Sequence, residues 1–181
     1  GSTDQSADIL NRYPSVRHLH QPARQGKLAA IHRATSYAQS EFLIFCDANC
    51  VLNPDAIRYI VRHYADPKVG GVAGEKKIQH ANDSAPGTGE GLYWQYESFL
   101  KRLDSELYTT VGAAGELFSI RRSLYELLPQ NTIIEDFVQS MKLCLKGFVV
   151  RYEPRAYTME LPSHSIKDEM KRKIRISAGA F

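Results

Sequence analysis

Cysteines, long apolar runs and an excess of one charge are all scarce in this sequence of 181 residues. The three cysteines, Cys46, Cys50 and Cys144, are odd in number and unevenly spaced, which argues against a disulfide framework. They indicate a reduced, cytoplasmic setting instead. No further pair of cysteines or histidines completes the four ligands of a structural zinc site.

Neither a membrane-spanning segment nor a signal peptide is visible in the sequence. No apolar run approaches the roughly 20 residues that cross a bilayer as a helix, so we expect this chain to be soluble. The formal net charge is +3 and no basic run with interleaved aromatic residues occurs, so nucleic acid is not an expected partner. With 43% hydrophobic and 24% charged residues, the chain can bury a core as a folded domain.

Segments with strand-like and helix-like patterns alternate along the chain. The apolar run Phe42–Cys46 ends in polar residues and predicts a strand buried on both faces of a parallel sheet. The alternation predicts a single α/β domain over residues 1–181, in which ligands bind beyond the carboxyl ends of the strands. Further strands are expected at residues 16–20, 69–74, 113–121 and 149–152, helices at 7–13, 28–38, 54–64, 92–107, 123–128 and 135–145, a long loop at 79–91, and an amphipathic basic tail from 166 onward.

Asp47 and Asn49 lie two residues apart at the end of the first apolar run. Carboxylate and amide oxygens in this arrangement can hold a hard divalent cation, which in turn neutralises a diphosphate. The alternative is that Asp47 caps the turn that follows through its own backbone. The pattern alone leaves both interpretations open.

Glu135 and Asp136 open an expected helix. Acidic side chains are favoured there by the helix dipole, so a structural role explains them without any chemistry. The functional alternative is that one carboxylate is a general base for an acceptor hydroxyl. Upstream, Gly115 and Glu116 end a turn of small residues, which either lets a sugar approach the backbone or is a tight turn only.

Basic residues occur at two further places. Lys27 follows Gly26 at an expected helix start, where a lysine can contact phosphate. The tail charges can meet a diphosphate, an anionic membrane surface, or only water. These tail residues are Lys171, Arg172, Lys173 and Arg175.

The order of these short motifs is more specific than any one of them. Gly-Ser-Thr-Asp comes first, then Arg-x-Gly-Lys, then Asp-Ala-Asn after an apolar strand. Gly-x-x-Gly-Glu-x-Phe-x-Ile-Arg-Arg, Glu-Asp-Phe and a basic Arg-x-x-Arg tail follow. This succession resembles the family 2 glycosyltransferases, and within them the membrane-associated branch of cellulose, hyaluronan and poly-N-acetylglucosamine synthases. The resemblance implies a GT-A fold with a mostly parallel sheet flanked by helices.

The resemblance also implies roles for the acidic residues. Asp47 is similar to the metal-coordinating aspartate of the family's D-x-D motif, and Asn49 stands where the second acid usually lies. Asp136 is similar to the catalytic base, with Glu135 as its neighbour. Gly115 and Glu116 fall in the acceptor-side loop.

Residues near the nucleotide follow from the same resemblance. Asp4 and Lys27 match positions near the donor nucleotide. Arg172 and Arg175 occupy the places of Gln and Arg in the family's Q-x-x-R-W motif, where they would contact the diphosphate. Ile176 stands where the tryptophan of that motif usually lies.

The expected function is therefore an inverting transfer of a sugar from a UDP-sugar to a polysaccharide or glycan acceptor, assisted by Mg²⁺ or Mn²⁺. Family members place two strands before Gly-Ser-Thr-Asp, so we expect this chain to lack the first strands, to bind donor poorly by itself and to self-associate. Segments outside it are expected to anchor the protein at the cytoplasmic face of the plasma membrane. The alternative is a non-catalytic nucleotide-binding or membrane-surface interaction module derived from such an enzyme.

Overall fold

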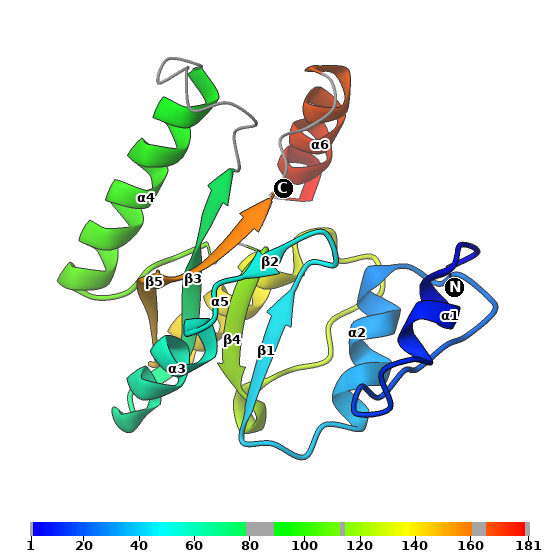
Figure 1. Cartoon of the computed structure of the whole chain (residues 1–181). Coiled ribbons are helices and arrows are strands. Elements are labelled where there is room, and N and C mark those ends of the chain that lie inside the picture. The colour runs from blue at the N-terminus through cyan, green and yellow to red at the C-terminus, as the bar shows by residue number, and fades with distance from the viewer. Residues whose placement is uncertain (1, 79–88, 113–114, 161–165, 180–181) are drawn as a thin grey trace. The chain divides into compact units, whose positions relative to one another are not determined.

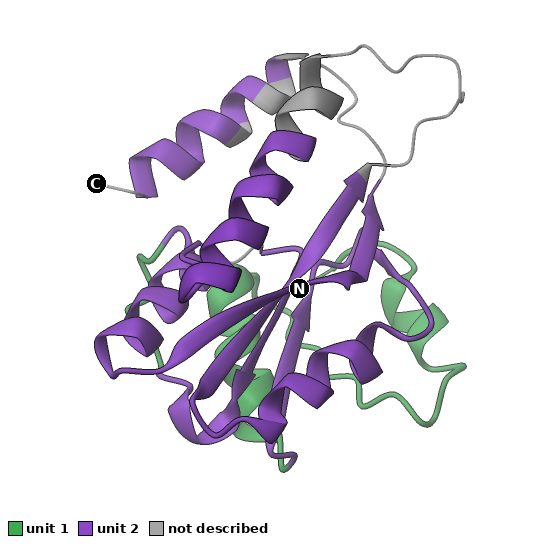
Figure 2. Ribbon diagram, turned by 90° about the vertical axis from the view of Figure 1, so that its left-hand side faces the viewer, with its two compact units in different colours: residues 1–39, 127–132 green, residues 40–126, 133–181 purple. Residues whose placement is uncertain are grey.

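The computed structural model describes residues 2–78, 89–112, 115–160 and 166–179. It divides into two compact units, shown in Figure 2: a smaller one of residues 1–39 and 127–132, and a larger one of residues 40–126 and 133–181. Most of the loop predicted at 79–91 lies outside the described residues. That residues 1–181 form one domain stays a prediction.

The larger unit is built on a five-stranded sheet in the order β1-β4-β3-β5-β2 (Figure 1). Helices pack against β3 and β5 of this sheet, so the predicted α/β fold is confirmed. The strands are β1 (Phe42–Cys46), β2 (Val51–Leu52), β3 (Val69–Ile78), β4 (Leu117–Arg121) and β5 (Val149–Glu160).

The strand pairing differs from the mostly parallel sheet that was predicted. Only β3 and β5 pair in parallel, and the other three pairs are antiparallel. The strands β1, β3 and β5 do run in the same direction, but β4 lies between β1 and β3 and runs against both. Alternating helices and strands give no signal for such an insertion, because it is a long-range pairing.

Strand β1 has the predicted bounds but not the predicted burial. Of its five residues only Leu43 is buried. Among the described strands β1 pairs with β4 alone, at one end of the sheet. A strand at the end of a sheet has a neighbouring strand on one side only, which explains why β1 is less buried than predicted.

The α-helices in the described part of the larger unit are α3 (Ala56–Val61), α4 (Gly89–Leu107), α5 (Glu135–Leu145) and α6 (Ile166–Gly179). Helix α3 continues as a 3₁₀ turn, Arg62–Ala65. Helix α5 buries Leu143 against the glycines of β3, where a Cβ added at Gly71 would lie 2.9 Å from Cδ1 of Leu143. In the described part of the chain, no helix is both long and apolar enough to cross a bilayer.

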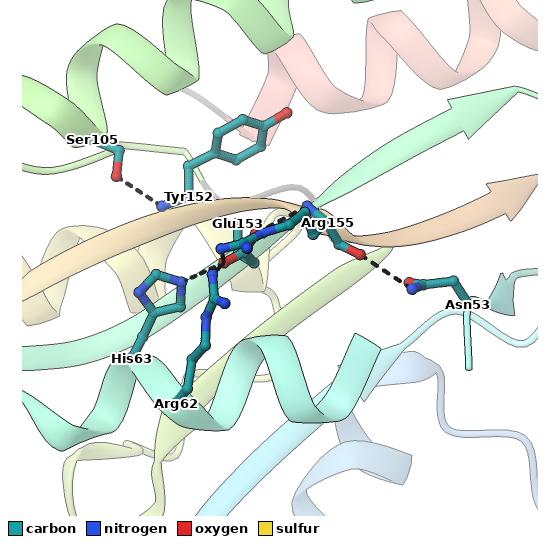
Figure 3. Close-up of polar contacts among 7 residues, drawn as sticks. All are labelled: Asn53, Arg62, His63, Ser105, Tyr152, Glu153 and Arg155. Atoms are coloured by element: carbon teal, nitrogen blue, oxygen red, sulfur yellow. Dashed lines mark hydrogen bonds and ion pairs between the residues drawn. The ribbon is translucent and has the colours of Figure 1, made fainter. Parts of the chain in front are cut away.

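Strand β5 bulges in its middle. Gly74 pairs with Glu153, but the next residue of β3 pairs with Tyr157, so three residues of β5 leave the ladder. The Glu153 carboxylate, with its side chain only 3% exposed, accepts hydrogen bonds from Arg62, from His63 Nε2 at 2.8 Å and from Arg155 Nε at 2.9 Å (Figure 3). These contacts hold the bulge against the turn that follows α3.

Asn53 holds the other side of the same bulge (Figure 3). Its Nδ2 donates to the Arg155 carbonyl at 3.2 Å, and its Oδ1 accepts from the Tyr157 backbone N–H at 2.8 Å. Because Asn53 follows β2 directly, these two hydrogen bonds fix β2 beside the last residues of β5. It thereby places the end of β5 next to the turn that follows β1.

The smaller unit contains α1 (Ser6–Leu10) and α2 (Lys27–Ser36). Gly26, with φ at 89°, leads into α2. The strand predicted at residues 16–20 is wrong, because this segment forms no ladder and the carbonyl of Leu19 accepts from the Arg33 guanidinium instead. The helix predicted at 123–128, in the larger unit and beyond, is reduced to a 3₁₀ turn, Arg122–Leu124.

Candidate active site

Polar side chains of the larger unit collect at one edge of its sheet. Asp47 follows β1 and Glu116 precedes β4, and the last pair of the ladder is Cys46 with Leu117. Both acids therefore leave the sheet at the same edge. Glu160 is the last residue of β5, which points toward that edge because β5 has the direction of β1.

The turn from Asp47 to Cys50 joins β1 to β2. The Cys50 backbone N–H donates to the Asp47 carbonyl at 3.1 Å, which closes the turn. Asn49 lies exposed on it, and its Nδ2 donates to Oε1 of Glu160 at 2.6 Å. The turn is therefore attached to β5 through Glu160, a residue that the sequence analysis did not single out.

Lys76, near the end of β3, joins two of the carboxylates. Its side chain is 4% exposed, and its Nζ contacts Oε1 of Glu116 at 2.8 Å and Oε2 of Glu160. A buried ammonium needs such partners, because an unpaired charge in the interior is very costly. Asn49, Glu160, Lys76 and Glu116 thus form one connected polar network.

The thiols beside the turn report the local charge. Burial first, and then the negative charges of Glu160, Asp47 and Glu116, raise the pKa of Cys50 to about 11. Burial also raises the pKa of Cys46, with Asp47 as the next cause. Burial is thus the main reason why thiolates are disfavoured here, and the nearby carboxylates add to it.

The donor set at the turn suits a hard divalent cation that shares its coordination with a ligand. Asp47 and Asn49 offer carboxylate and amide oxygens. Among the described residues no group of three or more His, Cys, Asp or Glu side chains could enclose a metal by itself. Mg²⁺ is commonly held by one or two carboxylates plus substrate phosphates, and these residues fit that mode.

The first turn of α5 packs against the loop before β4. A Cβ built on Gly115 would lie 2.9 Å from Oδ2 of Asp136, and one on Gly112 would lie 3.5 Å from the Phe137 ring. Gly115 thus lies beside the Asp136 carboxylate, and a side chain at position 115 would require that carboxylate to shift. The predicted acceptor-side loop and the predicted base are therefore neighbours, and Glu135 begins the same helix.

The carboxyl end of α6 reaches the residues just before α5. A Cβ on Gly179 would lie 2.9 Å from Cβ of Ile133. Arg175 lies one turn earlier in α6, on the same side of the helix as Gly179, and is exposed. The side chain of Arg172 lies outside the described residues.

Two predicted donor residues belong to the smaller unit. Asp4 lies just before α1, and its Oδ1 accepts from the Ser6 backbone N–H at 3.0 Å. Hydrogen bonds from the Ser6 side chain and backbone lower the pKa of Asp4. Lys27 is the first residue of α2. Their roles at the donor remain predictions.

Sequence reasoning missed Lys76 and Glu160. A weak signal existed for both: Lys76 belongs to the charged run Glu75–Lys77, which follows the apolar first part of its strand, and Glu160 closes a strand. Ligand sites of α/β sheets lie at such ends. The strand was predicted to end at residue 152, so Glu160 was not considered.

Comparison with known proteins decides the family. Residues 1–128 match the family described as Glycosyl transferase family 2. The chain belongs to this family. A poly-beta-1,6-N-acetyl-D-glucosamine synthase of Staphylococcus epidermidis is 26% identical over 187 residues, covering 99% of this chain and 45% of the relative. The enzyme of the same name from Staphylococcus aureus strain COL is 23% identical with the same coverage. This family 2 glycosyltransferase chain thus spans less than half the length of these relatives.

Solved structures show the same fold. A mannosyltransferase of Pyrobaculum calidifontis in complex with GDP-Man and Mn²⁺ superposes with a TM-score of 0.79 at 21% identity, covering 95% of this chain and 49% of that one. GalNAc-T7 with UDP, GalNAc and Mn²⁺ gives 0.60 at 16% identity, with 87% and 35% covered. The predicted GT-A fold of this family 2 glycosyltransferase is confirmed.

Proposed function

We propose that this chain provides the catalytic residues of an inverting glycosyltransferase that moves a sugar from a UDP-sugar to a glycan acceptor. The observation that carries the proposal is the closeness of Asp136 to Gly115, where a built Cβ would lie 2.9 Å from Oδ2 of Asp136. A carboxylate beside a residue without a side chain can accept the proton of a sugar hydroxyl that approaches this loop. Membership in a transferase family and the two staphylococcal relatives support the reaction class.

Asp47 and Asn49 would hold Mg²⁺ or Mn²⁺, which supplies the positive charge that neutralises the donor diphosphate. The carboxylates of Asp47, Glu160 and Glu116, which contribute to the raised pKa of Cys50 after burial, favour such a cation. The mannosyltransferase and GalNAc-T7 structures each hold Mn²⁺ with a nucleotide or nucleotide sugar, which supports the same pairing here.

Asp136 would take the proton from the acceptor hydroxyl as it attacks the anomeric carbon. Direct attack in line inverts that carbon. Glu135 lies beside the base, and Gly115 and Glu116 face the acceptor.

The leaving diphosphate would be stabilised by Arg175 and Arg172 of α6. Charge stabilisation of this kind is often the largest catalytic contribution. The packing of α6 against Ile133 brings its last turns to the beginning of α5, which supports the assignment for Arg175. Lys27 and Asp4 would contact the nucleotide.

The whole protein would build a polysaccharide at the cytoplasmic face of the plasma membrane, anchored by segments outside this chain. The names of the staphylococcal relatives support a polymer of amino sugars. One observation favours a second role: Met170 and Ile174 are exposed one turn apart on α6, near Lys171 and Lys173. A helix with this pattern can also lie on an anionic membrane surface.

Calorimetric titration with UDP, with and without Mn²⁺, tests the proposal on this chain and on the full-length protein. We expect UDP binding to require Mn²⁺ and to be stronger in the full-length protein. GDP serves as the comparison nucleotide. Absence of binding in both would contradict the transferase proposal. Sedimentation with anionic vesicles would then test the membrane-surface role, which predicts loss of binding when Lys171 and Lys173 are replaced by glutamine.

A further inference from the structure

Asn49 meets Glu160 although 111 residues separate them. An ionised carboxylate accepts hydrogen bonds and cannot donate them, so the amide nitrogen of Asn49 is the end that must face Glu160. The 2.6 Å contact between Nδ2 and Oε1 has this polarity. The amide oxygen Oδ1 lies at the other end of an exposed side chain, where the Cys50 thiol contacts it weakly at 4.0 Å. A hard cation is a stronger partner for that oxygen than a thiol.

Lys76 fixes the orientation of Glu160. Its Nζ contacts Oε2 of Glu160, while Oε1 of the same carboxylate accepts from Asn49. Glu116 holds the ammonium from the other side at 2.8 Å. Side-chain exposures of 4% for Lys76, 17% for Glu160 and 15% for Glu116 keep this network largely out of water, where its hydrogen bonds are strong.

We propose that Glu160 is a positioning residue for the cation site, an inference that rests on the proposed function. It orients the Asn49 amide so that Oδ1, and not Nδ2, faces the divalent cation at Asp47. Lys76 keeps one oxygen of Glu160 occupied, so that the other is always presented to Asn49. An amide serves at position 49 because its partner is an acid, and a second acid there would repel Glu160.

The amide at position 49 and the acid at position 160 can exchange places and still form the same hydrogen bond. In Glu160→Gln, the Lys76 ammonium donates to the amide oxygen of the new glutamine. The NH₂ group of that glutamine then faces Asn49. Asn49 then has to turn its own NH₂ group toward the cation. In Asn49→Asp two carboxylates oppose each other. In the double variant the new amide donates to the new carboxylate, and the net charge equals that of the wild type.

The test is an electron paramagnetic resonance titration of Mn²⁺ in the presence of UDP, with the full-length protein. Each single variant is expected to weaken Mn²⁺ binding roughly tenfold, as when a buried polar group loses its partner. The double variant Asn49→Asp/Glu160→Gln is expected to bind Mn²⁺ nearly as well as the wild type. Such recovery identifies a coupled pair.

A control variant, Asn11→Asp/Glu106→Gln, makes the same chemical changes at two exposed positions and is expected to bind Mn²⁺ like the wild type. Losses that simply multiply in the Asn49/Glu160 double variant would overturn the inference, as would tighter binding by Asn49→Asp alone. If the wild type binds no Mn²⁺ with UDP, the proposed function itself fails, and this inference with it.

Discussion

A methyl group on Gly115 would lie 2.9 Å from Oδ2 of Asp136 and 3.3 Å from its Cγ. Carbon and oxygen atoms do not approach so closely without displacement. The absence of a side chain at position 115 is therefore what allows the Asp136 carboxylate to occupy its place.

Gly115→Ala is predicted to slow sugar transfer while leaving donor binding intact. The new methyl group pushes the Asp136 carboxylate aside, and a misplacement of about 1 Å can cost roughly 100-fold in rate. The measurement is kcat for transfer together with the calorimetric affinity for UDP and Mn²⁺ in the full-length protein.

Gly147→Ala is the matched control for Gly115→Ala. Gly147 follows α5 at its other end, has φ at 81° and has no atom within 4 Å of a built Cβ. Its substitution should cost about 1–2 kcal/mol of stability through backbone strain and leave kcat unchanged. An unaltered kcat in Gly115→Ala would contradict the positioning of Asp136 described above.

The raised pKa of Cys50 predicts slow alkylation at neutral pH. Only the thiolate reacts, and burial together with Glu160, Asp47 and Glu116 keeps the pKa near 11. The rate with iodoacetamide, measured at Cys50 by mass spectrometry, should rise about tenfold per pH unit up to roughly pH 10. Saturating Mn²⁺ should shift this rise to lower pH, because a cation stabilises the thiolate. A rate that levels off near pH 8 would be inconsistent with this environment.

Glu153→Gln is predicted to lower the free energy of unfolding by about 1–3 kcal/mol. The side chain is buried and binds Arg62, His63 and Arg155, whereas an amide offers one oxygen to these three donors. The loss stays moderate because Arg62 and Arg155 are 41% and 57% exposed and can regain water. Urea unfolding measures the change.

Glu106→Gln, at an exposed position on α4, serves as the control for Glu153→Gln. Its effect should stay within about 0.5 kcal/mol, as is usual for surface substitutions. An equally small effect of Glu153→Gln would show that the ionic cluster does not hold the β5 bulge.

Local signals were sufficient for several elements. Helix α5 has its predicted bounds, because an acidic first turn, apolar spacing and Gly147 mark a helix without reference to the rest of the chain. Strand β1 was likewise found from one apolar run. Gly115 and Asp136 are neighbours in the structure, and the roles that the family resemblance gave them stay predictions.

Contacts between residues far apart in the sequence could not be predicted. The antiparallel insertion of β4 and the short strand β2 depend on partners distant in sequence. The network of Asn49, Lys76, Glu116 and Glu160 could not be predicted for the same reason, since its members come from two strands and two turns. A pattern of residue types indicates which side chains can bind an ion, and the fold decides which of them meet.

Asp136→Asn tests the central claim most directly, by transfer of labelled sugar from UDP-N-acetylglucosamine and by UDP affinity in the presence of Mn²⁺. The full-length variant should lose transfer by at least roughly 100-fold, because an amide cannot accept the hydroxyl proton, while UDP affinity stays unchanged. Transfer at the wild-type rate would contradict the assignment of Asp136 as the base. Loss of UDP binding and of transfer together would mean that Asp136 has a structural role instead.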